Sequence, residues 1–129
     1  MKSEEIRRLE RGSYISFATR KRSGDFAATP VWFAPDGDSY FAFSAGAAGK
    51  VKRLRNFSEC QIASCTVSGR LTGDWFDTHA YLLSEDVEEQ QALAALRKKY
   101  GWQMFIGDVF GKLTGKMEQR AYIRIDKPA

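Results

Sequence analysis

The alternation of apolar and polar residues is clearest in the middle of the chain, where it predicts a β-hairpin with aromatic strands. Two apolar runs, residues 30–34 and 39–44, lie on either side of the tetrapeptide Pro-Asp-Gly-Asp at residues 35–38. Proline, aspartate and glycine in this order favour a tight turn, and the flanking residue types favour strands. The pattern therefore predicts two antiparallel strands joined at residues 35–38.

The same kind of pattern predicts further strands on both sides of this hairpin. Short apolar or alternating runs bounded by turn-forming residues occur at residues 13–20, 26–34, 60–67, 74–83 and 119–125. Residues 13–20 are expected to pair with 26–34, and residues 60–67 with 74–83 across the loop at 68–73. Together with residues 39–44, these segments predict six antiparallel strands.

Helical spacing predicts three helices among the strands. Residues 3–10 form a short helix that stops before Gly12, and residues 50–57 place Val51 and Leu54 on one face. Residues 85–100 have an apolar stripe, with Ser84 as N-cap and cations in the last turn. The order of elements predicts a mainly β fold, a small Greek-key barrel with helices.

A second helical pattern follows the long helix. Six large apolar residues recur there at helical spacing: Trp102, Phe105, Ile106, Val109, Phe110 and Leu113. Three interpretations stay open for this segment: a subunit interface, a lid over a ligand, or packing in the core.

Composition restricts the class of protein. The chain has 129 residues, of which 43% are hydrophobic and 28% charged, so one domain over residues 1–129 is expected. No apolar run has the length of a membrane span, and the first residues lack the apolar core of a secretory signal, so a cytoplasmic location is expected. Cys60 and Cys65 are five residues apart, which places them on opposite faces of a strand and disfavours a disulfide. With one histidine and no CxxC pair, no metal site is predicted.

The charge points to an anionic partner, and its distribution points to one segment. The net charge is +4, and the segment after the aromatic hairpin has cations but no acid: Lys50, Lys52, Arg53 and Arg55. A loop of small residues, 45–49, precedes them. Such a loop lets backbone N–H groups approach an anion, and a helix N-terminus adds partial positive charge. The residues predict a phosphate site here, with an ordinary solvated helix face as the alternative.

No motif for side-chain catalysis is present. The chain lacks G-x-S-x-G, H-E-x-x-H and a Walker loop, and His79 in its predicted strand is interpreted as structural. Trp32, Trp75 and Trp102 each offer a ring for stacking, but aromatic residues of a small barrel usually serve the core or an interface.

Several motifs resemble one known family. TPVWF, PDGD, YFAFS, GKVKRLRN, CTVSGRLTGDW and ALRKKYGW are similar to segments of pyridoxamine 5′-phosphate oxidase-like split-barrel proteins, in particular the branch of probable deazaflavin-dependent oxidoreductases. The resemblance covers the chain from Ser13 to Ile125. It implies a six-stranded antiparallel split β-barrel of the FMN-binding type and a homodimer with cofactor sites between subunits.

The resemblance also implies a cofactor and the residues that bind it. The cofactor is flavin mononucleotide (FMN) or the deazaflavin coenzyme F-420, whose rings and phosphate the sequence does not distinguish. The residues implied to lie along the ring are Thr29, Pro30, Val31 and Trp32. Those implied to hold the phosphate are Phe43, Ser44, Gly49 and Lys50, with Lys52 and Arg53 as helpers. The resemblance places Trp32 near the ring.

Two departures from the better-characterised pyridoxamine phosphate oxidases disfavour vitamin B6 oxidation. Those enzymes have arginine where this chain has Ala28 and Thr29, and again where it has Gly49 beside the lysine.

Three functions are consistent with the sequence. The first is an oxidoreductase that transfers a hydride between the bound cofactor and a small conjugated substrate. Because such a cofactor supplies the redox chemistry, no catalytic side chain is predicted. The second is a non-catalytic carrier of the same cofactor. The third is a basic barrel that binds nucleic acid.

Overall fold

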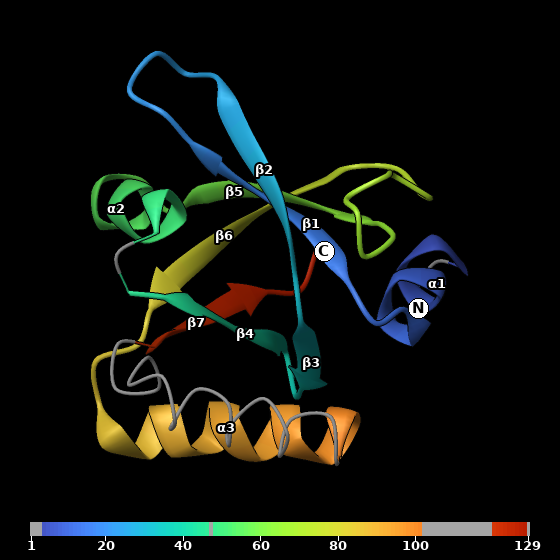
Figure 1. The fold of residues 1–129 in the computed structure, drawn as a ribbon, viewed down its shortest axis with the longest axis vertical. Coiled ribbons are helices and arrows are strands. Elements are labelled where there is room, and N and C mark those ends of the chain that lie inside the picture. The colour runs from blue at the N-terminus through green and yellow to red at the C-terminus, as the bar shows by residue number, and fades with distance from the viewer. Residues whose placement is uncertain (1–3, 47, 102–119, 129) are drawn as a thin grey trace.

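Seven antiparallel strands form one curled sheet in the computed structural model, which describes residues 4–46, 48–101 and 120–128 (Figure 1). In chain order the elements are α1 (Glu4–Arg11), β1 (Ile15–Arg20), β2 (Phe26–Val31), β3 (Phe33–Asp36), β4 (Ser39–Ala45), α2 (Gly49–Asn56), β5 (Glu59–Ser64), β6 (Phe76–Leu82), α3 (Asp86–Tyr100) and β7 (Arg120–Asp126). The strand order across the sheet is β2-β1-β5-β6-β7-β4-β3. The predicted mainly β, antiparallel barrel is confirmed.

The inner face of this curled sheet carries the main core. On β1 the side chains of Ile15 and Phe17 are fully buried, and on β4 those of Tyr40 and Ala42 are. Each pair is two residues apart, as expected for one face of a strand. Ile62, Ile123, Ile125, Val31 and Phe33 complete the inner cluster from the other strands.

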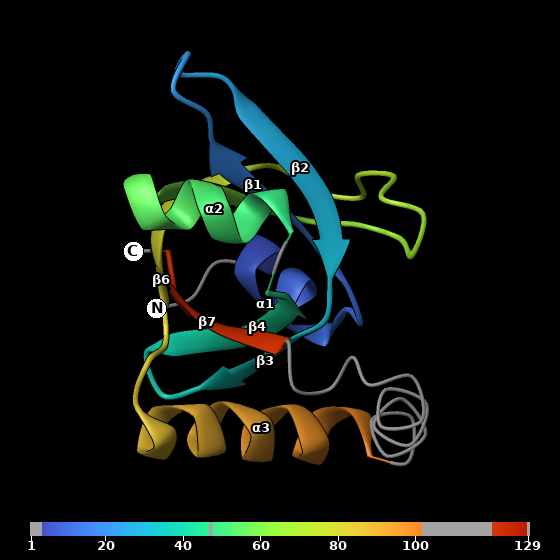
Figure 2. The ribbon, with the colours of Figure 1, turned by 60° about the vertical axis from the view of Figure 1, so that its left-hand side comes forward.

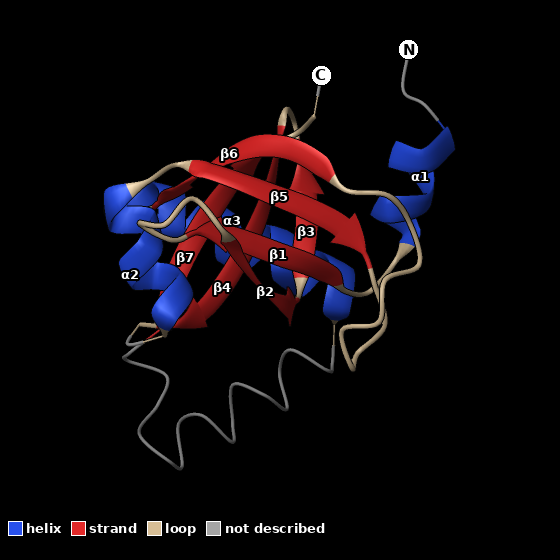
Figure 3. Ribbon diagram, turned by 90° about the horizontal axis from the view of Figure 1, so that it is seen from above, coloured by secondary structure: helices blue, strands red, loops and turns tan. Residues whose placement is uncertain are grey.

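The predicted strand at residues 26–34 is wrong in one respect, because it is two strands separated at Trp32. β2 pairs with β1, whereas β3 pairs with β4. These two strands lie at opposite edges of the sheet although they are consecutive in the chain, so the backbone must turn at Trp32 to pass from one edge to the other. This turn brings the two edges together and gives the sheet the form of a barrel (Figure 3).

Tyr100, the last residue of α3, holds the chain at this turn. Its Oη accepts a hydrogen bond from the N–H of Phe33 at 2.8 Å. The same hydroxyl lies 2.7 Å from the carbonyl oxygen of Ser13 and 2.8 Å from that of Phe33, and it donates its single proton to one of them.

Helices cover different parts of the sheet (Figure 2). α2 packs against β1 and β6 and buries Val51 and Leu54. α3 crosses β3, β4 and β7, where its buried Leu96 meets Ala34. α1 lies at the other end of the sheet from α2 and contacts β5 (Figures 1 and 3).

Several predicted boundaries differ from the observed ones. The N-cap of α3 is Glu85 and not Ser84, and its side chain makes no capping hydrogen bond. β5 ends at Ser64, and Cys65 makes only an isolated bridge to Leu71, so the observed strand ends before the predicted end at residue 67.

Both cysteines are buried free thiols. The predicted helical pattern at residues 102–113 lies outside the described residues. Within the described ranges, no helix has the length and apolar character needed to span a bilayer.

Candidate functional site

Four of the predicted phosphate-binding residues, Ser44, Gly49, Lys50 and Arg53, meet at the first turn of α2. The helix starts at Gly49, after Ala48 in an extended conformation that provides no side-chain cap. Its sequence, GKVKRLRN, contains no acid. The N–H groups of Val51 and Lys52 donate to the carbonyl oxygen of Ala48 at 3.1 and 3.4 Å. The N–H groups of Gly49 and Lys50 come before them, at the end of the helix that carries the partial positive charge of the helix dipole.

Lys50 lies against the end of β4. Its Nζ donates a hydrogen bond to Ser44 Oγ at 3.3 Å. Ser44 is only 8% exposed and follows Tyr40 and Ala42 on the inner face of β4. The register of β4 thus places a hydroxyl where the inner face of the barrel reaches α2.

Arg53 folds back toward the same turn. Its Nε donates to Thr19 Oγ1 at 2.6 Å, and its Nη1 lies 2.9 Å from the position that a Cβ on Gly49 would take. Glycine at this position therefore leaves room for the guanidinium over the helix start. Thr19 is fully buried on the inner face of β1, two residues after Phe17.

The two cations act on each other. Burial lowers the pKa of the Lys50 ammonium, and the neighbouring positive charge of Arg53 lowers it further. A phosphate between these cations would relieve the repulsion and replace the water that Lys50 loses. The local electrostatics therefore favour a bound anion.

On the inner face of the sheet, Thr29 places a buried polar group without a hydrogen-bond partner in the described part of the chain. It pairs with Phe17 of β1, and its Oγ1 is buried without a hydrogen-bond partner among the described residues. Val31, on the same face, is part of the core, whereas Pro30 is exposed and packs beside Gly69. A buried hydroxyl without a partner is uncommon in native proteins and marks a place for a ligand or water.

Trp32 and Phe43 lie on the other face of the sheet, toward α3. The Trp32 ring stacks on Tyr100 with centroids 4.3 Å apart and planes 8° apart, and Phe43 meets it edge-on at 6.2 Å. Phe43 and Ser44 are consecutive on β4, so their side chains point to opposite faces. The structure brings Trp32 and Phe43 together but separates both from Ser44 and Lys50, and Tyr100 covers one face of the Trp32 ring.

Lys52 also departs from the predicted cluster. It is exposed and lines a separate depression of about 250 Å³, which Arg53 also borders, with Arg20, Lys21, Arg22, Asn56 and Phe57. Arg20 is held by Glu59 at 3.0 Å and lies over the Phe57 ring. Residues two apart on a helix do not share a face, which explains why Lys50 and Lys52 diverge.

Sequence reasoning missed two residues of this region, Thr19 and Tyr100. Ile15, Phe17 and Thr19 occupy every second position of β1 and are all buried. A hydroxyl at a position where the alternation predicts an apolar core residue could have identified Thr19 from the sequence. Tyr100 belongs to the motif ALRKKYGW, but nothing in the motif indicated the role of its hydroxyl, which contacts residues 67 and 87 positions away.

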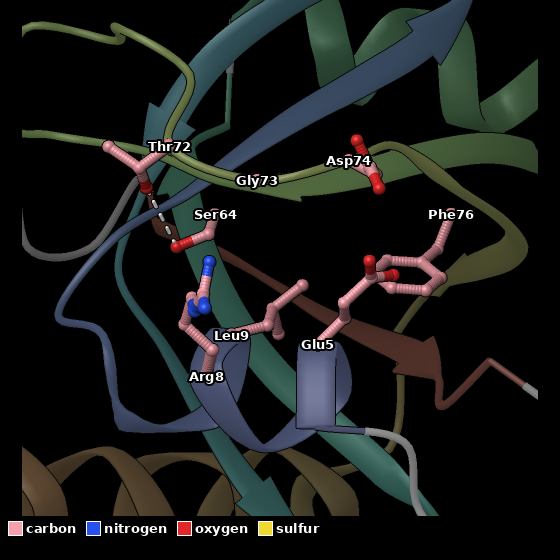
Figure 4. Close-up of a pocket in the computed structure, with 8 residues that line it drawn as sticks. All are labelled: Glu5, Arg8, Leu9, Ser64, Thr72, Gly73, Asp74 and Phe76. Carbon is pink, nitrogen blue, oxygen red and sulfur yellow. Dashed lines mark hydrogen bonds between the residues drawn. The ribbon is translucent and has the colours of Figure 1, made fainter.

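Another cavity lies at the end of the molecule where α1 packs. It has about 220 Å³ and lies between α1 and the loop before β6, lined by Glu5, Arg8, Leu9, Ser64, Thr72, Gly73, Asp74 and Phe76 (Figure 4). None of the predicted site residues lines it.

His79 is exposed, and its Nδ1 is 3.1 Å from Ser58 Oγ. Among the described residues, no cluster of three or more histidine, cysteine or acidic side chains could hold a metal.

Solved structures resemble the whole chain at low sequence identity. A heme storage protein, HutZ, from Vibrio cholerae matches 100% of this chain and 92% of its own, with a TM-score of 0.70 and 16% identity. An FAD-binding protein from Mesorhizobium loti matches 98% of this chain and 88% of its own, with a TM-score of 0.63 and 14% identity. A putative pyridoxamine 5′-phosphate oxidase from Listeria innocua matches 91% of this chain and 85% of its own, with a TM-score of 0.58 and 11% identity.

Sequence comparisons add nothing to these structural matches, because no protein-family model and no curated protein matches the chain. At identities of 11% to 16% the structural matches establish the fold alone. The chain has the antiparallel split-barrel fold of pyridoxamine 5′-phosphate oxidase-like and FMN-binding proteins.

Proposed function

We propose that the chain binds the phosphate of a flavin or deazaflavin cofactor at the first turn of α2 and uses this cofactor as an oxidoreductase. The observation that carries the proposal is that Lys50, bonded to the Ser44 hydroxyl, and Arg53, whose guanidinium lies at Gly49, meet at the first turn of this helix. A lysine whose pKa is lowered by burial and by a neighbouring guanidinium, on a helix without acids, favours an anion of two negative charges.

Each residue has a defined part in binding. Lys50 and Arg53 supply charge, Ser44 and the first N–H groups of α2 supply hydrogen bonds, and Thr19 orients Arg53 through its 2.6 Å bond. Gly49 keeps the helix start open. The buried Thr29 hydroxyl, on the inner face of β2, is available to a polar atom of the ring system or its side chain.

The redox chemistry would come from the cofactor, which accepts and donates a hydride. The chain itself has to bind, orient and shield the ring. Consistent with this division, the strand segment from Thr29 to Val31 is adjacent to the turn that Tyr100 fixes, so the strand next to the ring would be held rigidly. A small conjugated compound such as a quinone or an unsaturated carbonyl is the proposed substrate. The homodimer, with its cofactor sites between subunits, remains part of the proposal.

Cofactor titration tests the proposal. Purified protein is titrated with FMN, FAD, the deazaflavin coenzyme and heme, and absorbance and fluorescence report binding. Loss of a charged hydrogen bond costs about 1.5–3 kcal/mol, so Lys50→Ala should weaken binding by about 10- to 100-fold. Lys52→Ala removes an identical charge from the other side of the same helix and should weaken binding by less than ~3-fold.

Several outcomes would overturn the proposal. Equal losses in Lys50→Ala and Lys52→Ala would indicate a diffuse charge effect and not a site. Binding of heme alone, as the name of the Vibrio protein describes for that protein, would replace the flavin assignment. Binding without turnover, tested with reduced cofactor and a panel of quinones and unsaturated carbonyls, would favour the carrier function. Binding of nucleic acid with a steep salt dependence would favour the third function.

A further inference from the structure

A lysine outside the proposed phosphate site is buried without a partner. The ammonium nitrogen of Lys99, in the last turn of α3, is buried and has no hydrogen-bond partner among the described residues. It lies 3.5 Å from the centroid of the Phe33 ring and 5.4 Å from that of Tyr100. Burial lowers the pKa of Lys99 to about 8, while the negative charge of Glu10 acts in the opposite direction.

A cavity adjoins this lysine. It has about 380 Å³ and is lined by Glu10, Ala34, Pro35, Ala95, Lys98 and Lys99. The residues of the proposed phosphate site, Ser44, Lys50 and Arg53, are not among those that line this cavity. Alanine and proline form an apolar part of its wall, and one carboxylate and two amines provide polar groups. The lining therefore combines a nucleophile, an acid–base group and a surface cation.

Glu10 is held in place in this lining. Tyr40 Oη donates to Glu10 Oε2 at 2.8 Å, and Lys127 Nζ lies 3.7 Å from the same oxygen. Lys98, one residue before Lys99, is exposed. The groups with charge or a titratable proton around Lys99 come from three elements and the segment after β7: Glu10 of α1, Tyr40 of β4, Lys98 and Tyr100 of α3, and Lys127.

A lysine in this setting is chemically distinct from those on the surface. The neutral amine is the nucleophile, and burial in an apolar pocket is one way in which proteins activate lysine. At pH 8 about half of Lys99 is neutral, compared with roughly 0.4% of an ordinary lysine of pKa 10.4. Lys99 is itself one of the residues that line the cavity, so a compound in the cavity lies next to this side chain.

We propose that Lys99 is a covalent attachment site for a small carbonyl compound that carries an anionic group and enters the cavity beside α3. The lone pair of the neutral amine attacks the carbonyl carbon and forms the C–N bond. The amine gives up its two protons, the carbonyl oxygen takes up two, and the C–O bond breaks to release water, which yields an imine. Glu10 is the one carboxylate among the described residues of the lining and serves as the acid–base group, and the exposed ammonium of Lys98 pairs with the anionic group of the compound.

Reductive trapping tests this site on the full chain without cofactor. The protein is treated with glyoxylate and sodium cyanoborohydride, which reduces the imine to a stable secondary amine, and peptide mass spectrometry measures the modified fraction of each lysine. At pH 7.5 Lys99 should react about 10-fold faster than the exposed Lys98, because burial lowers the pKa of Lys99 and so raises the fraction of its amine that is neutral. The ratio of the two rates should fall once the pH exceeds about 8.

Matched variants separate the parts of the proposal. Lys99→Arg keeps the charge but has no nucleophilic amine, so the fast-reacting site should disappear. Lys98→Gln should slow the reaction of Lys99 with glyoxylate about 3-fold and leave its reaction with the neutral acetaldehyde unchanged. A Lys99 rate equal to or below that of Lys98 at pH 7.5, or a ratio that does not change with pH, would overturn the proposal. These readouts are independent of flavin binding, so failure here leaves the phosphate site untouched.

Discussion

At the scale of single residues, the region around the proposed site depends on a few hydroxyl groups whose partners are far away in the sequence. The Tyr100 hydroxyl joins the end of α3 to the backbone of Phe33 and Ser13, at the turn between β2 and β3. Thr19 fixes Arg53 in a similar way. These contacts position side chains and backbone that the hydrophobic pattern alone does not specify.

Tyr100→Phe tests the first of these contacts. The substitution keeps the ring that stacks on Trp32 but leaves the buried N–H of Phe33 without its partner. We expect the free energy of unfolding to fall by about 1.5–3 kcal/mol, measured by urea denaturation at constant m-value. Tyr81→Phe, on an exposed ring, is the control and should change it by less than ~0.5 kcal/mol. Similar values for the two variants would show that the hydroxyl does not hold the turn.

At the scale of elements, α2 combines an inner apolar side with a cationic N-terminus. Val51 and Leu54 anchor the helix on the barrel, and this anchoring places Lys50 and Arg53 at Ser44 and Thr19. Stability and anion binding therefore depend on different residues of one helix. A substitution at the helix start can separate the two properties.

Gly49→Ala is such a substitution. A Cβ there would come within 2.9 Å of Arg53 Nη1, the end of a flexible side chain, so the guanidinium would move away at little cost. We expect unfolding free energy to change by less than ~1 kcal/mol, because alanine is a better helix former than glycine. FMN affinity should fall about 5-fold, as expected for ~1 kcal/mol of lost phosphate contact. Unchanged affinity, measured by fluorescence titration, would place Arg53 outside the site.

The sequence predicted these elements well and their three-dimensional relations less well. The turn at residues 35–38, the apolar pair Val51 and Leu54 and the stripe of α3 are local signals, and the corresponding elements are confirmed. The break at Trp32 was not predicted, because it depends on tertiary pairing: the residues before it pair with β1 and those after it pair with β4. The divergence of Lys52 from Lys50 follows from helix geometry, whereas the roles of Thr19 and Tyr100 depend on contacts between distant residues.

At the scale of the whole molecule, we expect two chains to form the functional unit. The expectation comes from the split-barrel resemblance, in which the cofactor lies between subunits. If a partner completes the site, cofactor and dimer stabilise each other by mass action. Analytical ultracentrifugation should give twice the mass of the chain at micromolar concentration, and the dimer dissociation constant should fall when FMN is added. A monomer that binds FMN with unchanged affinity over a dilution series would contradict this.

The central claim is that Lys50 and Arg53 hold the phosphate of the cofactor, and it is tested most directly by comparing FMN with riboflavin, which has the same ring without the phosphate. Wild-type protein should bind FMN about 100-fold more tightly than riboflavin, since two charged contacts contribute ~3 kcal/mol or more. In the variant with both Lys50→Ala and Arg53→Ala, the preference should fall below about 5-fold while riboflavin binding stays the same. An equal preference for FMN in both proteins would contradict the account.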